Sequence, residues 1–322
     1  MEKLNGWPWE VAVDPKIYSA KINWPKISII TPSFNQGNYI EETILSIIKQ
    51  NYPNLEYIII DGGSSDQTLD IIKNYENQIT YWISEKDTGQ AHAINKGFKI
   101  ASGKIVNWLN SDDILAPSSL FNIAENFDDE TDIIAGNVID FKNNFEILHH
   151  VENKNLNLSS ILRINQSNHV FHQPGVWFNK KNLDLINPLN EALHYQFDWE
   201  FTLRYLYLFP RVNYLNKTLV FFRYHKDSKT VSKREEFFKD SVEVFNSLAL
   251  FTVENPKMSL KAHNKAYSLF WNHSITQFTQ RNRTKNRFVL FLYVLYEILK
   301  RPDKRTTRFT IGLLRKILSR EI

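Results

Sequence analysis

Short runs of β-branched and aromatic residues alternate with amphipathic segments over the first third of the chain. The runs are bounded by turn residues, which predicts buried strands; they occupy residues 26–31, 55–60, 79–83 and 104–109. The segments between them carry apolar residues at helical spacing, at residues 37–50, 66–75 and 89–101. This alternation predicts an α/β fold with a mainly parallel, mixed sheet flanked by helices. Ligands of such sheets gather beyond the carboxyl ends of the strands.

The pattern divides the chain into three parts. Residues 1–25 hold Trp7, Trp9 and Trp24 near prolines and predict an arm that packs on the main domain, residues 26–232. Residues 233–322 are mostly helical in pattern and predict a helical C-terminal extension. Within the main domain, a further helix is expected from Trp199 to Leu208.

Composition narrows the class of protein. A chain of 322 residues that is 43% hydrophobic can bury a large core, so it is expected to be globular. It has no cysteine, which favours a reduced, cytoplasmic compartment and leaves only oxygen and imidazole ligands for a metal. We find no secretion signal and no run of the ~18 to 20 apolar residues that a membrane-spanning helix needs.

Basic residues concentrate at the C-terminus. Residues 281–322 hold twelve Lys or Arg and three acids, a net charge of 12 − 3 = +9 within a chain of net charge +4. Amphipathic helices of this charge suit an anionic membrane surface, which would make the protein peripheral on the inner face of the cell membrane. They equally suit a terminal helical pair with solvated cations. Nucleic acid is not an expected partner, because no recognition motif accompanies the cluster.

Carboxylates follow two of the predicted strands. Asp61 is the last strand residue before the turn GGSSD, where it could accept a hydrogen bond from a pyrimidine base, and Asp66 is expected only to cap the next helix. In VNWLNSDDIL, Asp112 and Asp113 end another strand. One acid would suffice for a helix start, whereas two adjacent carboxylates repel each other unless a cation lies between them. The pair therefore favours a hard divalent ion completed by phosphate oxygens over a plain cap. No glycine-rich dinucleotide or P-loop motif is present.

At these positions the chain resembles the family 2 glycosyltransferases of the GT-A fold, most of all bacterial enzymes that build surface polysaccharides. The matching stretches are ITPSFNQGNYIEETILSIIKQNYPNLEYIIIDGGSSDQT, SEKDTGQAHAINKGF and NWLNSDD, and the likeness runs over about residues 26–230. The resemblance implies a donor site around the base, ribose and sugar, formed by Thr31, Pro32, Asn35, Asp61, Asp87, Gln90 and Asp112. It implies that Asp113 holds Mn²⁺ or Mg²⁺, while Asn110 replaces the first acid of the Asp-x-Asp-type motif.

The second half of the chain offers the remaining chemistry. Transfer of a sugar to a hydroxyl needs a base that accepts the hydroxyl proton. Asp198 in HYQFDWEF resembles the family's catalytic base, and its alternative role is to cap the helix. Glu200 is the second candidate for the base. The stretch HQPGVWF resembles the loop beside the acceptor, so Gln173 could bond a sugar hydroxyl and Trp177 could stack on a sugar or fill the core. In FRYHKDSKT, His225 is expected as a further metal ligand.

The resemblance implies an inverting, metal-dependent glycosyltransferase that uses a nucleotide-sugar donor, with UDP as the expected nucleotide. The expected acceptor is a glycan or a polyprenyl-linked sugar. A sugar-phosphate nucleotidyltransferase is the first alternative, but it would normally begin with a basic glycine-rich loop, which TPSFNQGN is not. A non-catalytic nucleotide-sugar binding module is the second, and it would need no base.

Overall fold

The computed structural model describes residues 6–142, 145–163, 171–225, 234–282, 287–300 and 308–319. Its contacts divide into two units, Met1–Asp240 and Ser241–Ile322, and the division falls inside helix α9 (Arg234–Phe251). The boundary expected at residues 232 and 233 lies outside the described residues, as do the first five residues of the predicted arm.

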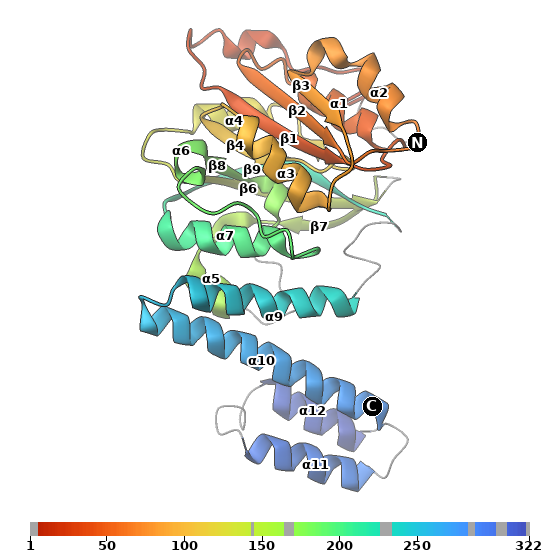
Figure 1. The fold of residues 1–322 in the computed structure, drawn as a ribbon, viewed down its shortest axis with the longest axis vertical. Helices are drawn as coiled ribbons and strands as arrows, with labels where there is room; N and C mark the ends of the chain where they lie inside the picture. Colours follow the sequence, from red (N-terminus) through yellow and green to blue (C-terminus); the bar gives the residue numbers. More distant parts are fainter. Residues whose placement is uncertain are drawn as a thin grey trace. The chain divides into compact units, whose positions relative to one another are not determined.

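The first unit opens with the predicted alternation of strands and helices (Figure 1). Strands β1 (Ile27–Ser33), β2 (Leu55–Asp61), β3 (Tyr81–Ser84) and β4 (Ile105–Trp108) pair in parallel in the order β3-β2-β1-β4. The helices between them are α1 (Ile40–Ile48), α2 (Thr68–Asn74) and α3 (Gln90–Ile100). The predicted α/β architecture is therefore confirmed, with element ends that differ by a few residues.

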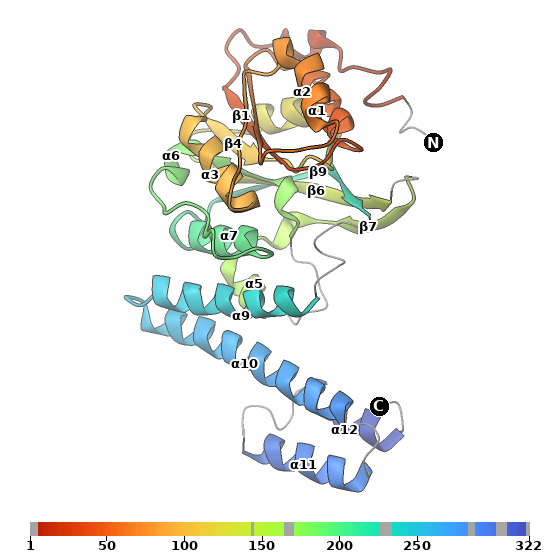
Figure 2. The same cartoon turned by 45° about the vertical axis from the view of Figure 1, so that its right-hand side comes forward.

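Beyond β4 the sheet becomes mixed. It continues through β8 (Val176–Asn179), β6 (Ile133–Lys142), β9 (Val212–Tyr224) and β5 (Ile114–Leu115), and β7 (Ile147–Val151) pairs with β6. Figure 2 shows β6, β7 and β9 side by side, with β6 parallel to β9 and antiparallel to β7. The connecting helices are α4 (Ser119–Glu125), α5 (Leu158–Arg163), α6 (Lys180–Leu183) and α7 (Phe197–Leu208). Short 3₁₀ turns lie at Pro15–Tyr18, Glu76–Gln78, Asn153–Asn155 and Gln173–Gly175.

Helix α3 packs directly against strand β1 because Gly97 faces the sheet. A Cβ atom at this position would lie 2.4 Å from Cγ2 of Ile30, so any larger residue would push the helix away. Both residues are buried. The close contact fixes α3 on the sheet, and the first turn of α3 carries Gln90.

The described part of the N-terminal arm packs on the first unit. The Trp7 indole N–H donates to the carbonyl of Leu115 over 2.9 Å, and the Tyr18 hydroxyl donates to the carbonyl of Gln50 over 2.8 Å. Trp7 and Trp24 are both buried. The arm therefore completes the core beside α1 and β5.

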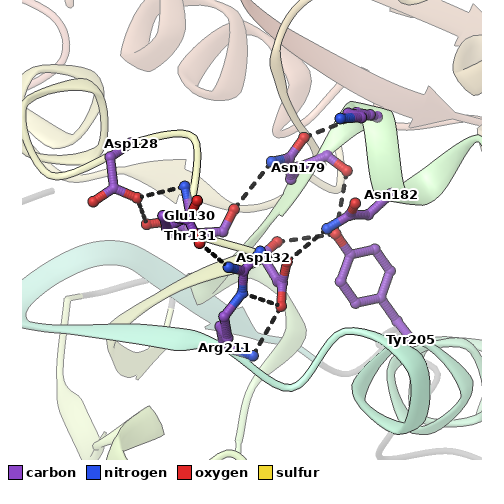
Figure 3. Close-up of polar contacts among 9 residues, drawn as sticks. Asp128, Glu130, Thr131, Asp132, Asn179, Asn182, Tyr205 and Arg211 are labelled. Carbon is purple, nitrogen blue, oxygen red and sulfur yellow. Dashed lines mark hydrogen bonds and ion pairs between the residues drawn. The ribbon is translucent and has the colours of Figure 1, made fainter.

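A buried polar network holds α7 against the sheet (Figure 3). The Tyr205 hydroxyl, on α7, donates to the carbonyls of Asp132 (2.9 Å) and Asn179 (3.2 Å). The Asp132 carboxylate accepts from the backbone N–H of Arg211 (3.0 Å) and from Asn182 (2.8 Å). Burial tends to raise the pKa of Asp132, but these bonds and the Arg211 guanidinium hold it below its usual value. Tyr205 and Asp132 are buried, whereas the Arg211 side chain is exposed, so the network holds α7, whose first turn carries Asp198, from its buried end.

The second unit is helical, as predicted. Its helices after α9 are α10 (Pro256–Arg281), α11 (Arg287–Leu299) and α12 (Arg308–Ser319). Apolar side chains of all three helices form one small core: Trp271, Ile275, Leu290, Val294, Ile298, Leu313 and Ile317. Among the residues that the structure describes, no helix is long and apolar enough to cross a membrane.

Candidate functional site

One cavity of about 380 Å³ brings together many of the residues that the sequence singled out. It lies at the carboxyl ends of β1 and β4, the end of β9, and the first turns of α3 and α7. Seven of the predicted site residues line it: Pro32, Asp87, Gln90, Asp112, Gln173, Asp198 and His225. The segment VNWLNSDDIL therefore reaches the wall of this cavity, and its role in ligand binding stays a prediction.

Asp112 and His225 are in direct contact on the wall of this cavity. The Asp112 Oδ2 and His225 Nε2 atoms are 2.9 Å apart, and the His225 ring lies 4.6 Å from the Tyr39 ring. The His225 side chain is only 4% exposed, whereas Asp112 is 20% exposed. One carboxylate oxygen and one imidazole nitrogen are a donor set that Mn²⁺ accepts, and phosphate oxygens and water can supply the other ligands. No cluster of three acidic, His or Cys side chains suited to a metal exists among the described residues, so a cation here would depend on a bound ligand.

Asp113 lies where the sequence did not predict it. Its carboxylate is fully buried, accepts from the Arg223 N–H (3.0 Å) and from Asn110 Nδ2 (3.1 Å), and does not line the cavity. Burial, reinforced by the neighbouring charge of Asp112, raises the pKa of Asp113 well above its usual value. The two adjacent acids thus point to different environments, and the structure does not support Asp113 as the cation-facing acid.

Arg223 joins this buried acid to the first helix. Its Nε atom donates to the carbonyl of Asp112 over 2.8 Å, and its Nη2 atom forms an ion pair with Glu42 on α1. Arg223 is 3% exposed. The ion pair ties the end of β9 to α1, and the Nε hydrogen bond ties it to the segment that carries Asp112.

Asp61 builds the turn after β2. Its carboxylate accepts from the N–H groups of Gly63 (3.0 Å) and Ser64 (2.8 Å), and from the hydroxyls of Ser84 (2.6 Å) and Ser64. It is 0% exposed and does not line the cavity. In this structure both carboxylate oxygens are used inside the protein, so a base contact would require the turn to rearrange.

Two other residues predicted to bind the nucleotide-sugar donor, Thr31 and Asn35, do not line the cavity. Thr31 is buried, and its hydroxyl accepts from the Tyr57 hydroxyl at 3.2 Å. Asn35 has a φ of 51°, accepts from the Ser65 N–H (2.9 Å), and donates its own N–H to Ser64 (2.7 Å). These contacts join the loops after β1 and β2. Asp66 was expected only to cap α2, but the N-cap of that helix is Gln67; the Asp66 carboxylate accepts from the Thr68 N–H and from the Gly37 N–H, each over 3.0 Å, and so also joins the two loops.

Asp198 lies in the first turn of α7 and borders the cavity. The helix begins one residue earlier, at Phe197, so Asp198 is not its N-cap. Its Oδ1 atom accepts from the Trp199 N–H at 2.9 Å, and the helix N-terminus stabilises its negative charge. The preceding loop is anchored by Asp240, which accepts from the N–H groups of His194 (3.0 Å) and Tyr195 (2.8 Å). The carboxylate is therefore held at a defined place on the wall.

Glu200, the rival base, forms a buried ion pair. Its two oxygens accept from Arg204 Nε (2.7 Å) and Nη2 (2.8 Å), and both side chains are at most 6% exposed. Arg204 also donates to the carbonyls of Asn187 and Pro188, each over 2.9 Å. Glu200 does not line the cavity, so its contacts indicate a structural role.

Replacing Glu200 by Gln is expected to destabilise the fold by about 3 kcal/mol, because the buried Arg204 loses its charge partner. Activity per folded molecule should stay unchanged. Urea unfolding measures the first quantity, and turnover in the absence of urea measures the second. The exposed Glu76→Gln variant is the control. A Glu200→Gln protein of normal stability that fails to turn over would identify Glu200 as the base.

The two predicted acceptor residues differ in placement. Gln173 borders the cavity, and its Nε2 atom donates to Asn107 Oδ1 (2.7 Å) and to the carbonyl of Trp108 (3.2 Å). Trp177 is 1% exposed and belongs to the core. Of its two predicted roles, the structure supports the core one, because its ring has no access to a bound sugar.

The sequence did not identify several residues of the cavity wall. Phe34 follows β1 directly and is 59% exposed, which is unusual for an aromatic side chain in a folded domain. The other side chains that had not been assigned a site are Ser33, Gln36, Trp108, Ser111, His194, Tyr195, Phe197 and Phe222. Their proximity to the predicted motifs is the only sequence feature that could have indicated them.

Hydrogen bonds within the cavity wall join the two segments that were predicted to bind the nucleotide-sugar donor. Gln90 Nε2 donates to Asn110 Oδ1 over 2.7 Å, which links the start of α3 to the end of β4. Asp87 accepts from the Gly89 N–H over 2.9 Å and closes the turn before α3. The amide of Asn110 thus bridges Gln90 and the buried Asp113.

A family model and a curated relative both identify the chain as similar to glycosyltransferases. Residues 28–186 match "Glycosyl transferase family 2". Over 95 residues, the chain is 43% identical to a putative teichuronic acid biosynthesis glycosyltransferase, TuaG, of Bacillus subtilis; the match covers 28% of this chain. It also covers only 38% of that relative, so the chain spans well under half of its length.

Two solved structures share the fold. TarS residues 1–349 of S. aureus, in complex with UDP, has a TM-score of 0.58 and 21% identity, over 81% of this chain and 75% of that one. A mannosyltransferase from Pyrobaculum calidifontis in complex with GDP-Man and Mn²⁺ has a TM-score of 0.51 and 17% identity, over 97% and 90%. The sheet described above is thus a GT-A sheet. The cavity residues from Pro32 to Gln173 lie in the matched segment, and the chain belongs to the family 2 glycosyltransferases.

Proposed function

We propose that this protein transfers a sugar from a nucleotide-diphosphate sugar, with UDP as the nucleotide, to a hydroxyl group of a glycan or a polyprenyl-linked acceptor. We further propose that the anomeric configuration inverts and that the product belongs to a surface polysaccharide. The observation that carries the proposal is the shared cavity: Asp198 lies on the same wall as the Asp112–His225 pair. A base and a diphosphate-binding pair are the two functions that this transfer requires.

The reaction would proceed as a single displacement. The Asp198 carboxylate would accept the proton of the acceptor hydroxyl as the acceptor oxygen bonds to the anomeric carbon. The bond between that carbon and the diphosphate oxygen would break, and its electron pair would leave with the nucleoside diphosphate. No covalent intermediate with the protein is needed, and attack from the face opposite the leaving group gives inversion.

Asp112 and His225 are the proposed ligands of Mn²⁺ or Mg²⁺. This assignment replaces the sequence-based choice of Asp113, since Asp112 is the acid that reaches the cavity. When bound, the cation would neutralise charge on the departing diphosphate. His225 would also orient the Asp112 carboxylate through their 2.9 Å contact.

Neighbouring polar groups would position the donor. Gln90 and Asp87 flank the start of α3 and would serve the ribose and sugar, while Pro32 would border the base. Phe34 offers an exposed ring for stacking. Gln173 would face the acceptor, although its amide already bonds Asn107. Thr31, Asn35 and Asp61 do not line the cavity, and they would contribute indirectly, through hydrogen bonds that hold the loops after β1 and β2.

Titration calorimetry with UDP, GDP and dTDP, each with and without Mn²⁺, tests the donor assignment. We expect UDP to bind most tightly, and to bind more tightly with Mn²⁺, because a cation would join its diphosphate to Asp112 and His225. Preferential binding of GDP or dTDP would change the nucleotide but keep the reaction class. Binding of none of the three would remove the basis of the proposal.

A further inference from the structure

Helix α11 presents apolar side chains on both of its faces. On one face Leu290, Val294 and Ile298, spaced four residues apart, are buried in the core of the second unit. The other face consists of five apolar or aromatic side chains that are 47–68% exposed: Phe288, Val289, Leu292, Tyr296 and Leu299. Beside them Tyr293 is 39% exposed, and its ring stacks on Phe278 of α10 with ring centres 4.0 Å apart. A helix on the surface of a soluble unit normally turns polar residues outward. The outer face of α11 is therefore suited to a contact that the isolated unit does not make.

The adjoining helix extends this apolar surface. A groove between α11 and α12 is lined by Phe291, Ile311, Leu314 and Leu318, together with Arg315 and Ser319. Ile311 is 57% exposed and Leu318 is 64% exposed. The same unit thus exposes apolar side chains on α12 as well as on α11.

Positive charge surrounds this surface. Arg315 and Lys316 are exposed on α12, and Lys300 follows the end of α11. In residues 287–300 and 308–319 the only acid is Glu297, whose carboxylate lies 2.9 Å from Lys300 Nζ. The Lys300 ammonium also lies 4.1 Å from the centre of the Tyr296 ring. An anionic partner would meet cations and almost no negative charge here.

We propose that this α11–α12 surface docks on an anionic lipid bilayer. Tyr296 combines an exposed apolar ring with a polar hydroxyl, the chemistry that favours the boundary between lipid tails and water. The 13 residues of α11 extend only about 20 Å, less than the ~30 Å apolar core of a bilayer, so the helix lies along the surface. A second copy of the chain is a poorer occupant, because it would bring like charges together. Lipid docking goes beyond the proposed function, and neither depends on the other.

Flotation of the full chain with vesicles tests this docking. We expect binding to phosphatidylcholine vesicles that contain phosphatidylglycerol, and much weaker binding to phosphatidylcholine alone. The double variant Leu292→Gln, Tyr296→Gln should bind at least about tenfold more weakly, because it removes apolar area from the outer face. Neither side chain belongs to the buried core, so the fold should persist. Leu185→Gln, which changes a 68% exposed leucine in the first unit, is the matched control.

Variants that neutralise the cations measure the contribution of charge to vesicle binding separately from that of apolar contact. Arg315→Gln and Lys316→Gln should each weaken binding to the anionic vesicles about fivefold, and added salt should have the same direction of effect. Equal binding of the double variant and the wild type to these vesicles would overturn the proposal. So would a wild-type dimer that the double variant converts to a monomer, because a second copy would then cover the face. UDP titration on the same variants reports the proposed nucleotide site independently.

Discussion

Replacing Asp198 by Asn is expected to lower kcat for sugar transfer by about 10²–10⁴-fold, the usual contribution of a general base. Asn has nearly the same shape as Asp, and its amide oxygen can still accept from the Trp199 N–H, so helix α7 should keep its first turn. It cannot accept a proton from an acceptor hydroxyl. UDP affinity should therefore change little while the chemical step becomes slow.

The measurement is single-turnover transfer from UDP-sugar, paired with UDP titration on the same sample. Asp70→Asn is the matched control, because Asp70 lies in the first turn of α2, as Asp198 does in α7, but is remote from the cavity wall. This control separates the general effect of a helix-terminal carboxylate from the effect of a base. Full transfer activity in Asp198→Asn would refute the assignment, whereas loss of UDP binding would indicate a role in the donor site.

The first half of the sheet was predictable because its information is local. The β-branched runs that become β1, β2 and β4 are buried along their length, and the intervening segments have helical periodicity. Parallel strands joined by helices place their carboxyl ends on one edge. This geometry predicted that Asp112 lies at the ligand-binding edge, whereas Pro32, Asp87 and Gln90 were grouped with it through the family resemblance.

The second half was less predictable because its pairings are not local. Strand β6 joins β9 about 80 residues later, with Ile133 opposite Val212, and no periodicity in either strand specifies that partner. The Asp132–Arg211 bonds that support the pairing likewise depend on two distant positions. Trp177 shows the same difficulty on a small scale, since only the packing of β8 between β4 and β6 decides that its ring is buried.

Adjacent residues in one motif can also have environments that the sequence does not distinguish. Asp112 and Asp113 are chemically identical in the sequence, and which of them reaches the cavity depends on Arg223, 110 residues beyond Asp113. The Arg223 N–H and Asn110 donate hydrogen bonds to the Asp113 carboxylate. Arg223 Nε donates to the backbone carbonyl of Asp112, whereas the Asp112 side chain contacts His225. The sequence therefore located the motif, and the structure distinguished its two acids.

The two acids can be distinguished by experiment. Asp112→Asn is expected to weaken Mn²⁺ binding in the presence of UDP about 10–100-fold, because a neutral amide is a much poorer ligand than a carboxylate. UDP affinity should then fall to its value without Mn²⁺. Electron paramagnetic resonance of free Mn²⁺ measures the first quantity, and calorimetry measures the second. Neither readout requires an acceptor or turnover.

Asp113→Asn is the matched comparison, and we expect it to retain the Mn²⁺ dependence of UDP binding. Burial already raises the pKa of Asp113 and disfavours its charged form, so a neutral isostere should be tolerated electrostatically. Its cost should appear in the urea midpoint, because the amide can place only one oxygen against the two donors, the Arg223 N–H and Asn110. The reverse pattern, with Mn²⁺ dependence lost in Asp113→Asn and kept in Asp112→Asn, would restore the assignment made from the sequence and would require the Arg223 contact to open when the donor binds.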